Sequence, residues 1–188
     1  IIPLIGGETI AMQNVFGEKP QYILSYTDFE ANDSQLLDYY NRTVPYIKLD
    51  MGGSAPRSVD VVNTVCPCAG LSSLSFTSGS DNPTNDWMLR AARYVLENVQ
   101  PQVFWGENAP ALFTNSGKDV REGLREIGTK HGYSFSLYKT STSKHGAPQH
   151  RDRTFYFFWD SEHAPIMNWY NRPMPELEDF LDQIPSYA

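Results

Sequence analysis

The sequence contains few cysteines, no long apolar run and no excess of positive charge. Cys66 and Cys68 are the only two cysteines among 188 residues, too few for the disulfide framework of a small secreted domain. Two thiols without further Cys ligands also make a poor structural zinc site, so we expect no metal. No apolar run approaches the roughly 18 residues of a membrane span, so we expect no membrane. The start, Ile1-Ile2-Pro3, lacks the basic region of a signal peptide and an initiator Met, which predicts a processed or trimmed amino end.

Charge is distributed unevenly along the chain. The 15 basic and 22 acidic residues give a net charge of −7, which by itself argues against nucleic-acid binding. Residues 118–153, however, hold eight basic and four acidic residues, whereas residues 154–188 hold one basic and six acidic residues. A solvated helix followed by a loop explains the basic segment as well as a functional surface does. With 40% hydrophobic and 13% aromatic residues, the chain can bury the core of one domain.

Apolar runs alternate with stretches of helical periodicity. Strands are predicted at residues 1–5, 22–26, 46–50, 59–65, 103–105, 134–139 and 154–159. Helices are predicted at about residues 10–16, after Ser34, at 87–99 and at 118–131, and the turn-rich residues 77–86 are predicted to form a mobile loop. This alternation favours an α/β fold with a parallel sheet, in which ligands bind beyond the carboxyl ends of the strands.

Small, acidic or nucleophilic residues follow five of the predicted strands: Gly6-Gly7, Asp28, Asp50, Cys66-Pro67-Cys68 and Glu107-Asn108. The glycines allow a tight turn and a close backbone approach to a ligand. Asp28 lies 21 residues beyond Gly7, where nucleotide-binding sheets hold ribose hydroxyls, and Glu30 competes for this role. A solvated acid at the start of a helix explains the same spacing. Asp50 is a candidate acceptor for an adenine amino group.

Cys68, Glu107 and two arginines form a second set of candidates. Cys68 lies on a predicted turn after a buried strand, a position typical of a nucleophile, and a structural thiol is the alternative. Glu107 follows another strand and is a candidate general acid. Arg151 and Arg153 alternate in a predicted strand entry, so their side chains are expected to point the same way, toward an anionic or carbonyl partner.

Three segments, in this order, resemble motifs of the DNA cytosine-5 methyltransferases. Residues 65–72, Val-Cys-Pro-Cys-Ala-Gly-Leu-Ser, resemble the nucleophile loop Pro-Cys-Gln-Gly-Phe-Ser of that family. Residues 107–112, Glu-Asn-Ala-Pro-Ala-Leu, resemble its Glu-Asn-Val signature, and residues 146–153 resemble its Gln-x-Arg-x-Arg motif. The likeness also covers Gly6-Gly7, Asp28, Tyr40-Asn41 and Asp50 and so spans nearly the whole chain.

The resemblance implies a Rossmann-like S-adenosylmethionine-dependent methyltransferase fold. Such a fold has a mostly parallel sheet with helices on both faces and an antiparallel strand near the carboxyl-terminal end. The implied cofactor is S-adenosylmethionine, with S-adenosylhomocysteine as product, and the residues implied to hold it are Gly6, Gly7, Asp28, Asp50 and Pro67. The implied substrate is double-stranded DNA with one cytosine flipped out of the stack. Asn108, Gln149 and Ser72 are implied contacts of the base or its covering loop, which spans about residues 71–85.

The resemblance also assigns catalytic roles. Cys68 adds to carbon 6 of cytosine, Glu107 hydrogen-bonds or protonates ring nitrogen 3, and Arg153 holds the base carbonyl with support from Arg151. Carbon 5 then takes the methyl group. Cys66 takes a structural role, in preference to forming a Cys66–Cys68 redox pair. We therefore expect a DNA (cytosine-5-)-methyltransferase of the restriction-modification type in the cytoplasm of a prokaryote or carried by a phage.

Several positions depart from the family pattern. The family has Phe, Gly, Glu, Gln and Phe where this chain has Ile2, Leu4, Asp28, Ala69 and Leu71. These departures keep open the alternative of an inactive methyltransferase-like module that binds a partner or cofactor. A nucleotide-binding thiol enzyme is a third possibility, although it would have no need of the Gln149-x-Arg151-x-Arg153 motif.

The family pattern predicts two parts of unequal size in this chain. Residues 1–160 are expected to form the catalytic domain, and residues 161–188 the start of a linker toward a missing target recognition domain. A further segment or a second chain would supply that domain and most of the phosphate contacts. The catalytic part alone is therefore expected to bind DNA weakly.

Overall fold

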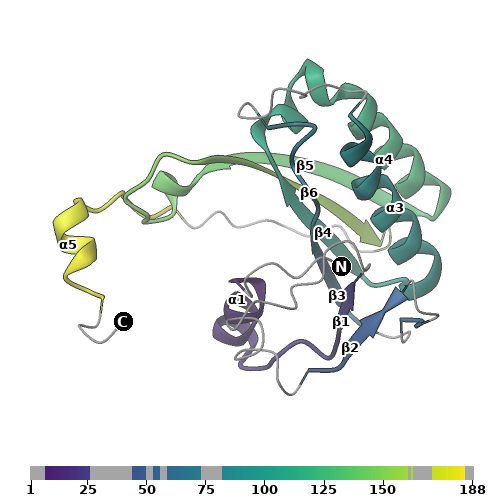
Figure 1. Ribbon diagram of the computed structural model, residues 1–188, viewed down its shortest axis with the longest axis horizontal. Coiled ribbons are helices and arrows are strands. Elements are labelled where there is room, and N and C mark those ends of the chain that lie inside the picture. The colour runs from purple at the N-terminus through teal and green to yellow at the C-terminus, as the bar shows by residue number, and fades with distance from the viewer. Residues whose placement is uncertain are drawn as a thin grey trace.

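The computed structural model describes residues 7–25, 44–49, 53–55, 59–72, 82–160, 162 and 171–184. Its strands form two sheets (Figure 1). In the first, β1 (Ile23–Ser25) pairs in parallel with β2 (Tyr46–Lys48). In the second, the order is β3 (Val61–Val65), β4 (Val103–Asn108), β6 (Asp152–Asp160) and β5 (Tyr133–Ser141). The strands predicted in these regions are confirmed, and the strand predicted at residues 1–5 lies outside the described residues.

Strand directions in the larger sheet match the expected mixed topology. β3 and β4 are parallel, whereas β6 runs antiparallel to both β4 and β5. As a result, the amino-terminal start of β6 meets the carboxyl-terminal end of β4. The hairpin of β5 and β6 thus brings its polar loop to the edge where ligands bind in parallel α/β sheets.

The two faces of this sheet differ in burial. Along β4, Phe104, Gly106 and Asn108 are buried, whereas Trp105 and Glu107 between them are half-buried. Opposite Phe104, the ring of Phe158 stacks at a centroid distance of 5.4 Å, and Tyr156 meets Phe104 edge to face. This alternation follows from the two-residue period of a strand and defines one core-facing side of the sheet.

Two helices cover the core-facing side. α3 (Asp86–Tyr94) continues into a π-helical turn at Val95–Val99, and α4 (Lys118–Lys130) packs beside it. The apolar residues that predict a helix at 87–99 are all buried: Met88, Ala91, Ala92, Val95, Leu96 and Val99. The predicted extent is confirmed, but the last turn is wider than α-helical. Gln100 ends this turn in the left-handed region at φ 56°, and its N–H bonds the carbonyl of Val95.

Helix α1 (Gly7–Phe16) lies on the opposite side of the sheet, so helices flank both faces as predicted (Figure 1). A groove of about 580 Å³ lies between α1 and the sheet and is lined by α1, β1, β3 and Trp105. In the described part of the chain, no helix is long and apolar enough to cross a bilayer.

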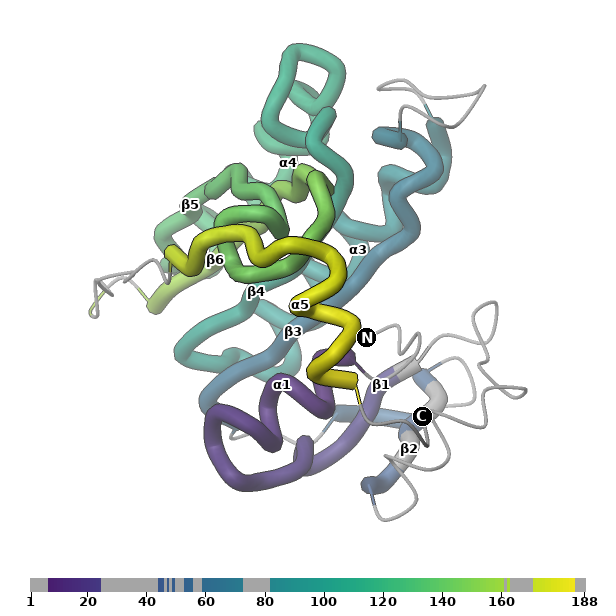
Figure 2. The backbone as a smooth tube through the Cα atoms, turned by 90° about the vertical axis from the view of Figure 1, so that its left-hand side faces the viewer, coloured from purple at the N-terminus to yellow at the C-terminus, as the bar shows by residue number. Residues whose placement is uncertain are grey.

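The carboxyl-terminal segment 171–184 leaves the sheet. It is attached at the β5–β6 loop, where the Arg172 N–H donates to the carbonyl of Lys144 at 2.8 Å. Helix α5 (Leu177–Leu181) lies apart from the sheet, at the left of Figure 1. In Figure 2, which is turned by 90°, the same helix faces the viewer in front of the rest of the chain. Leu177 and Leu181 remain 57% and 52% exposed, so this helix does not share the domain core.

Candidate functional site

The loop that follows β3 presents one cysteine and buries the other. Cys66 is 4% exposed, whereas Cys68 is exposed. The Leu71 N–H donates to the Cys68 carbonyl at 2.9 Å and closes a turn, and Leu71 itself is buried. The turn therefore fixes Cys68 between a buried strand end and a buried anchor. Burial raises the pKa of the Cys66 thiol, which makes it a poor nucleophile and fits the predicted structural role.

A second anchor holds the far side of this turn. The Gly70 N–H donates to Thr84 Oγ1 at 3.0 Å, just before α3. A Cβ atom at Gly70 would lie 2.1 Å from Asn85 Oδ1, so only glycine fits here without a shift of Asn85. Ser72, a predicted loop contact, is the last residue described before the gap at 73–81.

Glu107 and Asn108 are the last two residues of β4. The sequence predicts a strand at 103–105 that ends at Gly106-Glu107-Asn108, and the structure includes these three residues in the strand, with Gly106 packed beneath the Tyr156 ring. Sheet pairing aligns Glu107 with Val65 on one side and with Phe155 on the other. Glu107 therefore lies beside the end of β3 that leads into the cysteine loop.

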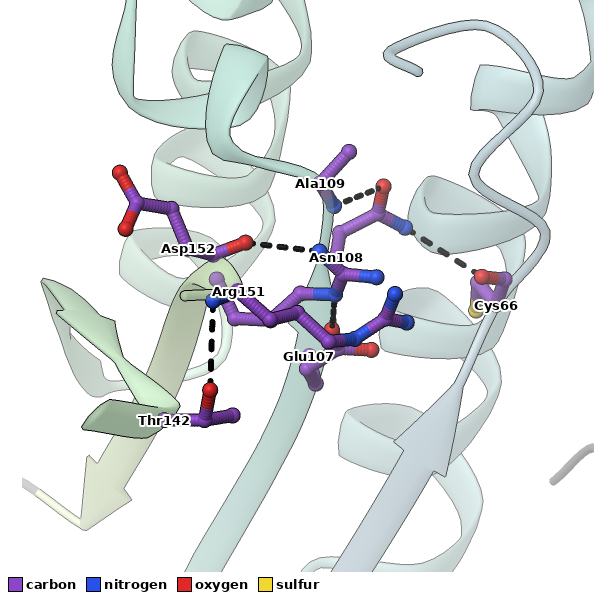
Figure 3. A network of polar contacts seen from close by, with 8 residues as sticks. Cys66, Glu107, Asn108, Ala109, Thr142, Arg151 and Asp152 are labelled. Atoms are coloured by element: carbon purple, nitrogen blue, oxygen red, sulfur yellow. Dashed lines mark hydrogen bonds and ion pairs between the residues drawn. The ribbon is translucent and has the colours of Figure 1, made fainter. Parts of the chain in front are cut away.

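Two arginines, one just before β6 and one at its start, face the Glu107 carboxylate. Arg153 Nε lies 2.5 Å from Glu107 Oε1, and its Nη1 donates to the Asp152 carbonyl at 2.7 Å. Arg151 extends its side chain toward Glu107 from just before the strand (Figure 3). Burial raises the pKa of Glu107, the positive charge of Arg151 opposes this rise, and the negative charge of Glu8 adds to it. The prediction that both arginines point the same way agrees with this arrangement.

Asn108 links β4 to the cysteine loop. It is fully buried, its Nδ2 donates to the Cys66 carbonyl at 3.3 Å, and its Oδ1 accepts from the Ala109 N–H at 2.9 Å (Figure 3). The contact to Cys66 lies in the cysteine loop, so it does not test the prediction that Asn108 contacts the base or its covering loop. This buried amide holds Cys66 at a fixed place relative to Glu107.

The loop between β5 and β6 carries Gln149, which is exposed, as is Arg151. The Gln149 N–H donates to the Ala147 carbonyl at 2.8 Å. Thr142, at the beginning of this loop, donates its hydroxyl to the Gln149 carbonyl at 2.6 Å and accepts from the Arg151 N–H at 3.2 Å. No sequence pattern marks Thr142, because a lone threonine in a polar loop has many roles.

Three further residues form the surroundings of Cys66, and no motif in the sequence predicts their contacts. Thr64 Oγ1 lies 3.5 Å from Cys66 Sγ, and the fully buried Tyr156 hydroxyl faces the same thiol. A Cβ atom at Gly106 would come within 2.3 Å of the Tyr156 hydroxyl oxygen. The signal for this contact was Gly106 itself, since glycine inside a strand marks a close approach.

The residues predicted to hold the cofactor are only partly described. Gly7 begins α1, and a Cβ atom there would meet no atom of the described residues within 4 Å. Pro67 follows β3 in the cysteine loop. Gly6, Asp28 and Asp50 lie outside the described residues. Among the described residues, the space beside Gly7 and the half-exposed Pro67 are compatible with a bulky nucleoside ligand. Among the residues that the structure describes, no group of three or more His, Cys, Asp or Glu side chains could hold a metal ion.

The comparison with protein families gives one clear match. Residues 29–187 match the model of the C-5 cytosine-specific DNA methylases. Among curated proteins, the type II methyltransferase M.AgeI from Thalassovita gelatinovora is 31% identical over 105 residues, which are 56% of this chain and 24% of that protein. The chain therefore spans about a quarter of the length of this relative.

Solved structures support the fold. The methyltransferase EhMeth from Entamoeba histolytica aligns with a TM-score of 0.59 and 16% identity over 87% of this chain and 52% of its own. A DNMT2 mutant from Spodoptera frugiperda aligns with a TM-score of 0.60 and 11% identity over 95% of this chain and 55% of its own. These two alignments therefore support the mixed α/β fold described above.

Proposed function

Because the chain belongs to the C-5 cytosine-specific DNA methylase family, we propose that it supplies the catalytic residues for transfer of a methyl group from S-adenosylmethionine to carbon 5 of cytosine in DNA. The observation that carries this proposal is the strand register. It aligns Val65, Glu107 and Phe155 across three neighbouring strands, so the cysteine loop, Glu107 and the arginines share one sheet edge.

Cys68 is proposed as the nucleophile. Its sulfur adds to carbon 6 of a flipped cytosine, and the electron pair of the bond between carbons 5 and 6 moves toward carbon 5. This addition is needed because carbon 5 of cytosine alone is too weak a nucleophile to take a methyl group. The exposed position of Cys68 on a closed turn supports this role.

Glu107 is proposed to act on ring nitrogen 3. A carboxyl group whose pKa is raised by burial retains its proton closer to neutral pH, so it can donate to that nitrogen. The donated hydrogen bond withdraws electrons from the ring and makes carbon 6 more electrophilic. Arg153 contacts Glu107 through Nε and still has N–H groups to donate to the base carbonyl. Arg151 and Gln149 would support the base from the same loop.

When bound, S-adenosylmethionine supplies the methyl group as an electrophile. Gly7 and Pro67, together with Gly6, Asp28 and Asp50, are the residues proposed to hold it. Carbon 5 would use its electron pair to form the new carbon–methyl bond, and the sulfur–methyl bond of the cofactor would break with its electron pair left on sulfur, giving S-adenosylhomocysteine. Loss of the proton on carbon 5 then restores the double bond to carbon 6, and the bond between carbon 6 and Cys68 breaks to release the thiolate and the methylated base.

We propose that the partner is duplex DNA and that residues 1–160 form the catalytic domain. Residues 161–188 would begin a linker to a target recognition domain, which a further segment or a second chain supplies. The position of α5 apart from the sheet supports this division. By this proposal, Ser72 belongs to the loop that covers the flipped base.

Adduct formation tests the proposed function. The chain, alone and mixed with the carboxyl-terminal part of a family member such as M.AgeI, is incubated with S-adenosylmethionine and duplex DNA containing 5-fluorocytosine. The fluorine cannot leave as a cation, so the Cys68 adduct accumulates and shifts the protein on a denaturing gel. Cys68→Ser is expected to abolish the shifted band, whereas Cys66→Ser retains it. Absence of an adduct in both mixtures would favour a non-catalytic methyltransferase-like module.

A further inference from the structure

Thr142 ties together both ends of the loop that carries the arginines. Its N–H donates to the Arg151 carbonyl at 3.1 Å, and its hydroxyl accepts from the Arg151 N–H at 3.2 Å (Figure 3). The same hydroxyl donates to the Gln149 carbonyl at 2.6 Å, and the Thr142 carbonyl accepts from the Ala147 N–H at 3.3 Å. One residue thus fixes the backbone of Gln149 and Arg151 at once.

We propose that Thr142 is a positioning residue that directs Arg151 toward Glu107. This inference deepens the proposed function, since it rests on Glu107 and Arg151 acting in one site. Arg151 precedes β6 and so lacks the pairing that the strand gives to Arg153. Its backbone is instead held on both its N–H and its carbonyl by Thr142. The threonine therefore determines where the Arg151 side chain leaves the loop.

The consequence concerns the charge on Glu107. Three charged groups act on its carboxyl: Arg153 from β6, Arg151 from the loop, and Glu8 from α1. Arg153 is held by the sheet and Glu8 by a helix. Arg151 is the positive group whose place depends on Thr142. Loss of the Thr142 hydroxyl is expected to let Arg151 move away, and the pKa of Glu107 then rises further because an opposing positive charge is withdrawn.

The hydroxyl group is the part of Thr142 that this role requires. It serves as donor to Gln149 and as acceptor from Arg151, which a methyl group of the same size cannot do. Valine keeps the shape and removes both bonds, whereas serine keeps both. Ser143 provides a matched control, because its hydroxyl bonds Ser141 Oγ and not the arginine motif.

The test is a titration of the Glu107 side-chain carboxyl carbon by NMR in chains labelled with ¹³C-glutamate, with Glu107→Gln to assign the signal. It needs neither DNA nor cofactor, so it is independent of methyl transfer. Thr142→Val is expected to shift the titration midpoint of Glu107 upward, whereas Thr142→Ser and Ser143→Ala retain the wild-type midpoint. A wild-type midpoint in a folded Thr142→Val chain would overturn the proposal, and so would an equal shift in Thr142→Ser.

Hydrogen exchange keeps the proposal testable if Thr142→Val does not fold. In the wild-type chain the Arg151 N–H is expected to exchange more slowly than the N–H of an unstructured arginine, and Thr142→Ser is expected to preserve this protection. Exchange of the wild-type Arg151 N–H at the unstructured rate would overturn the proposal. Failure of the adduct test with a confirmed titration would refute the proposed function and leave the Thr142–Arg151–Glu107 relationship standing.

Discussion

Arg153 on β6 places its Nε 2.5 Å from Oε1 of Glu107 on β4, with both side chains about one-fifth exposed. The contact arises because β6 runs antiparallel to β4, so that the start of one strand meets the end of the other. Two residues 46 positions apart in the sequence thereby form a partly desolvated pair beside the cysteine loop. In the proposed function, this pair places a carboxyl group and a guanidinium where both would reach the same planar base.

Glu107 is expected to make stability depend on pH. Its folded pKa lies above the ordinary value because burial disfavours the carboxylate. The protonated form is therefore favoured by folding, and its contribution is fully present below the unfolded pKa and is lost as the pH rises through the folded pKa. Unfolding by urea at a series of pH values checks this. In Glu107→Gln, the free energy of unfolding is expected to fall less as the pH rises through the folded pKa of Glu107. A pH profile of stability equal to that of the wild type would contradict the expectation.

Glu107→Gln is also expected to slow adduct formation with 5-fluorocytosine DNA. General acid catalysis typically contributes a factor of about 10² to 10⁴, so a loss in this range is predicted for the rate of the shifted band. Glu122 on α4 offers a control, because it is half exposed and pairs with Lys118 of its own helix, so Glu122→Gln is expected to leave the rate unchanged. Equal rates for Glu107→Gln and the wild type would remove Glu107 from the mechanism.

The two cysteines are expected to differ in reactivity toward iodoacetamide. Cys68 is exposed, whereas Cys66 is 4% exposed and burial raises the pKa of its thiol. Mass spectrometry of the native chain should find alkylation at Cys68 well before Cys66, with both labelled after denaturation. Similar rates at the two thiols in the native chain would show that Cys66 is not enclosed by Thr64 and Tyr156.

Asn108→Ala is expected to lower the free energy of unfolding by about 1–3 kcal/mol. The substitution leaves the buried Cys66 carbonyl and the Ala109 N–H without the amide that pairs both. Asn98 on the exposed side of the neighbouring helix bonds the Tyr94 carbonyl, and Asn98→Ala is expected to change stability by less than about 0.5 kcal/mol. Denaturant unfolding compares the two, and a small loss for Asn108→Ala would refute the linking role.

Gly106→Ala is expected to destabilise the fold by about 1–3 kcal/mol through overpacking, because the new Cβ atom would overlap the Tyr156 ring end. Tyr156→Leu removes that ring end and leaves a cavity in its place. A double-mutant cycle on the free energy of unfolding is expected to show that Gly106→Ala costs little in the Tyr156→Leu background. Additive losses would mean that the two residues do not compete for the same space.

Much of the fold could be predicted from the sequence because its signals are local. Alternating or continuous apolar runs marked β3, β5 and β6, and the periodic stripe from Met88 to Val99 marked α3 with its π-helical turn. The apolar run that marks β4 covers only Val103, Phe104 and Trp105, and the strand continues through Gly106 and Glu107 because both pair with β3 and β6. The predicted helix after Ser34 lies outside the described residues.

Residues of the candidate site could be predicted from the sequence only where they belong to a recognisable motif. Cys68, Glu107, Arg151 and Arg153 stood in recognisable patterns, and their roles remain proposals. Thr142 and Tyr156 stood in none, since each acts through contacts that the β5–β6 hairpin and the sheet register create. Such partners are distant or unremarkable in sequence, and their identity depends on where the strands pair.

Mapping the adduct to a residue tests the central claim most directly. The product formed with 5-fluorocytosine DNA and S-adenosylmethionine is digested with protease and nuclease, and the modified peptide is sequenced by tandem mass spectrometry. The mechanism predicts a methylated 5-fluorocytosine nucleotide on Cys68, with Cys66 unmodified. A nucleotide on Cys66, or an adduct that persists in Cys68→Ser, would contradict the assignment of Cys68 as the nucleophile.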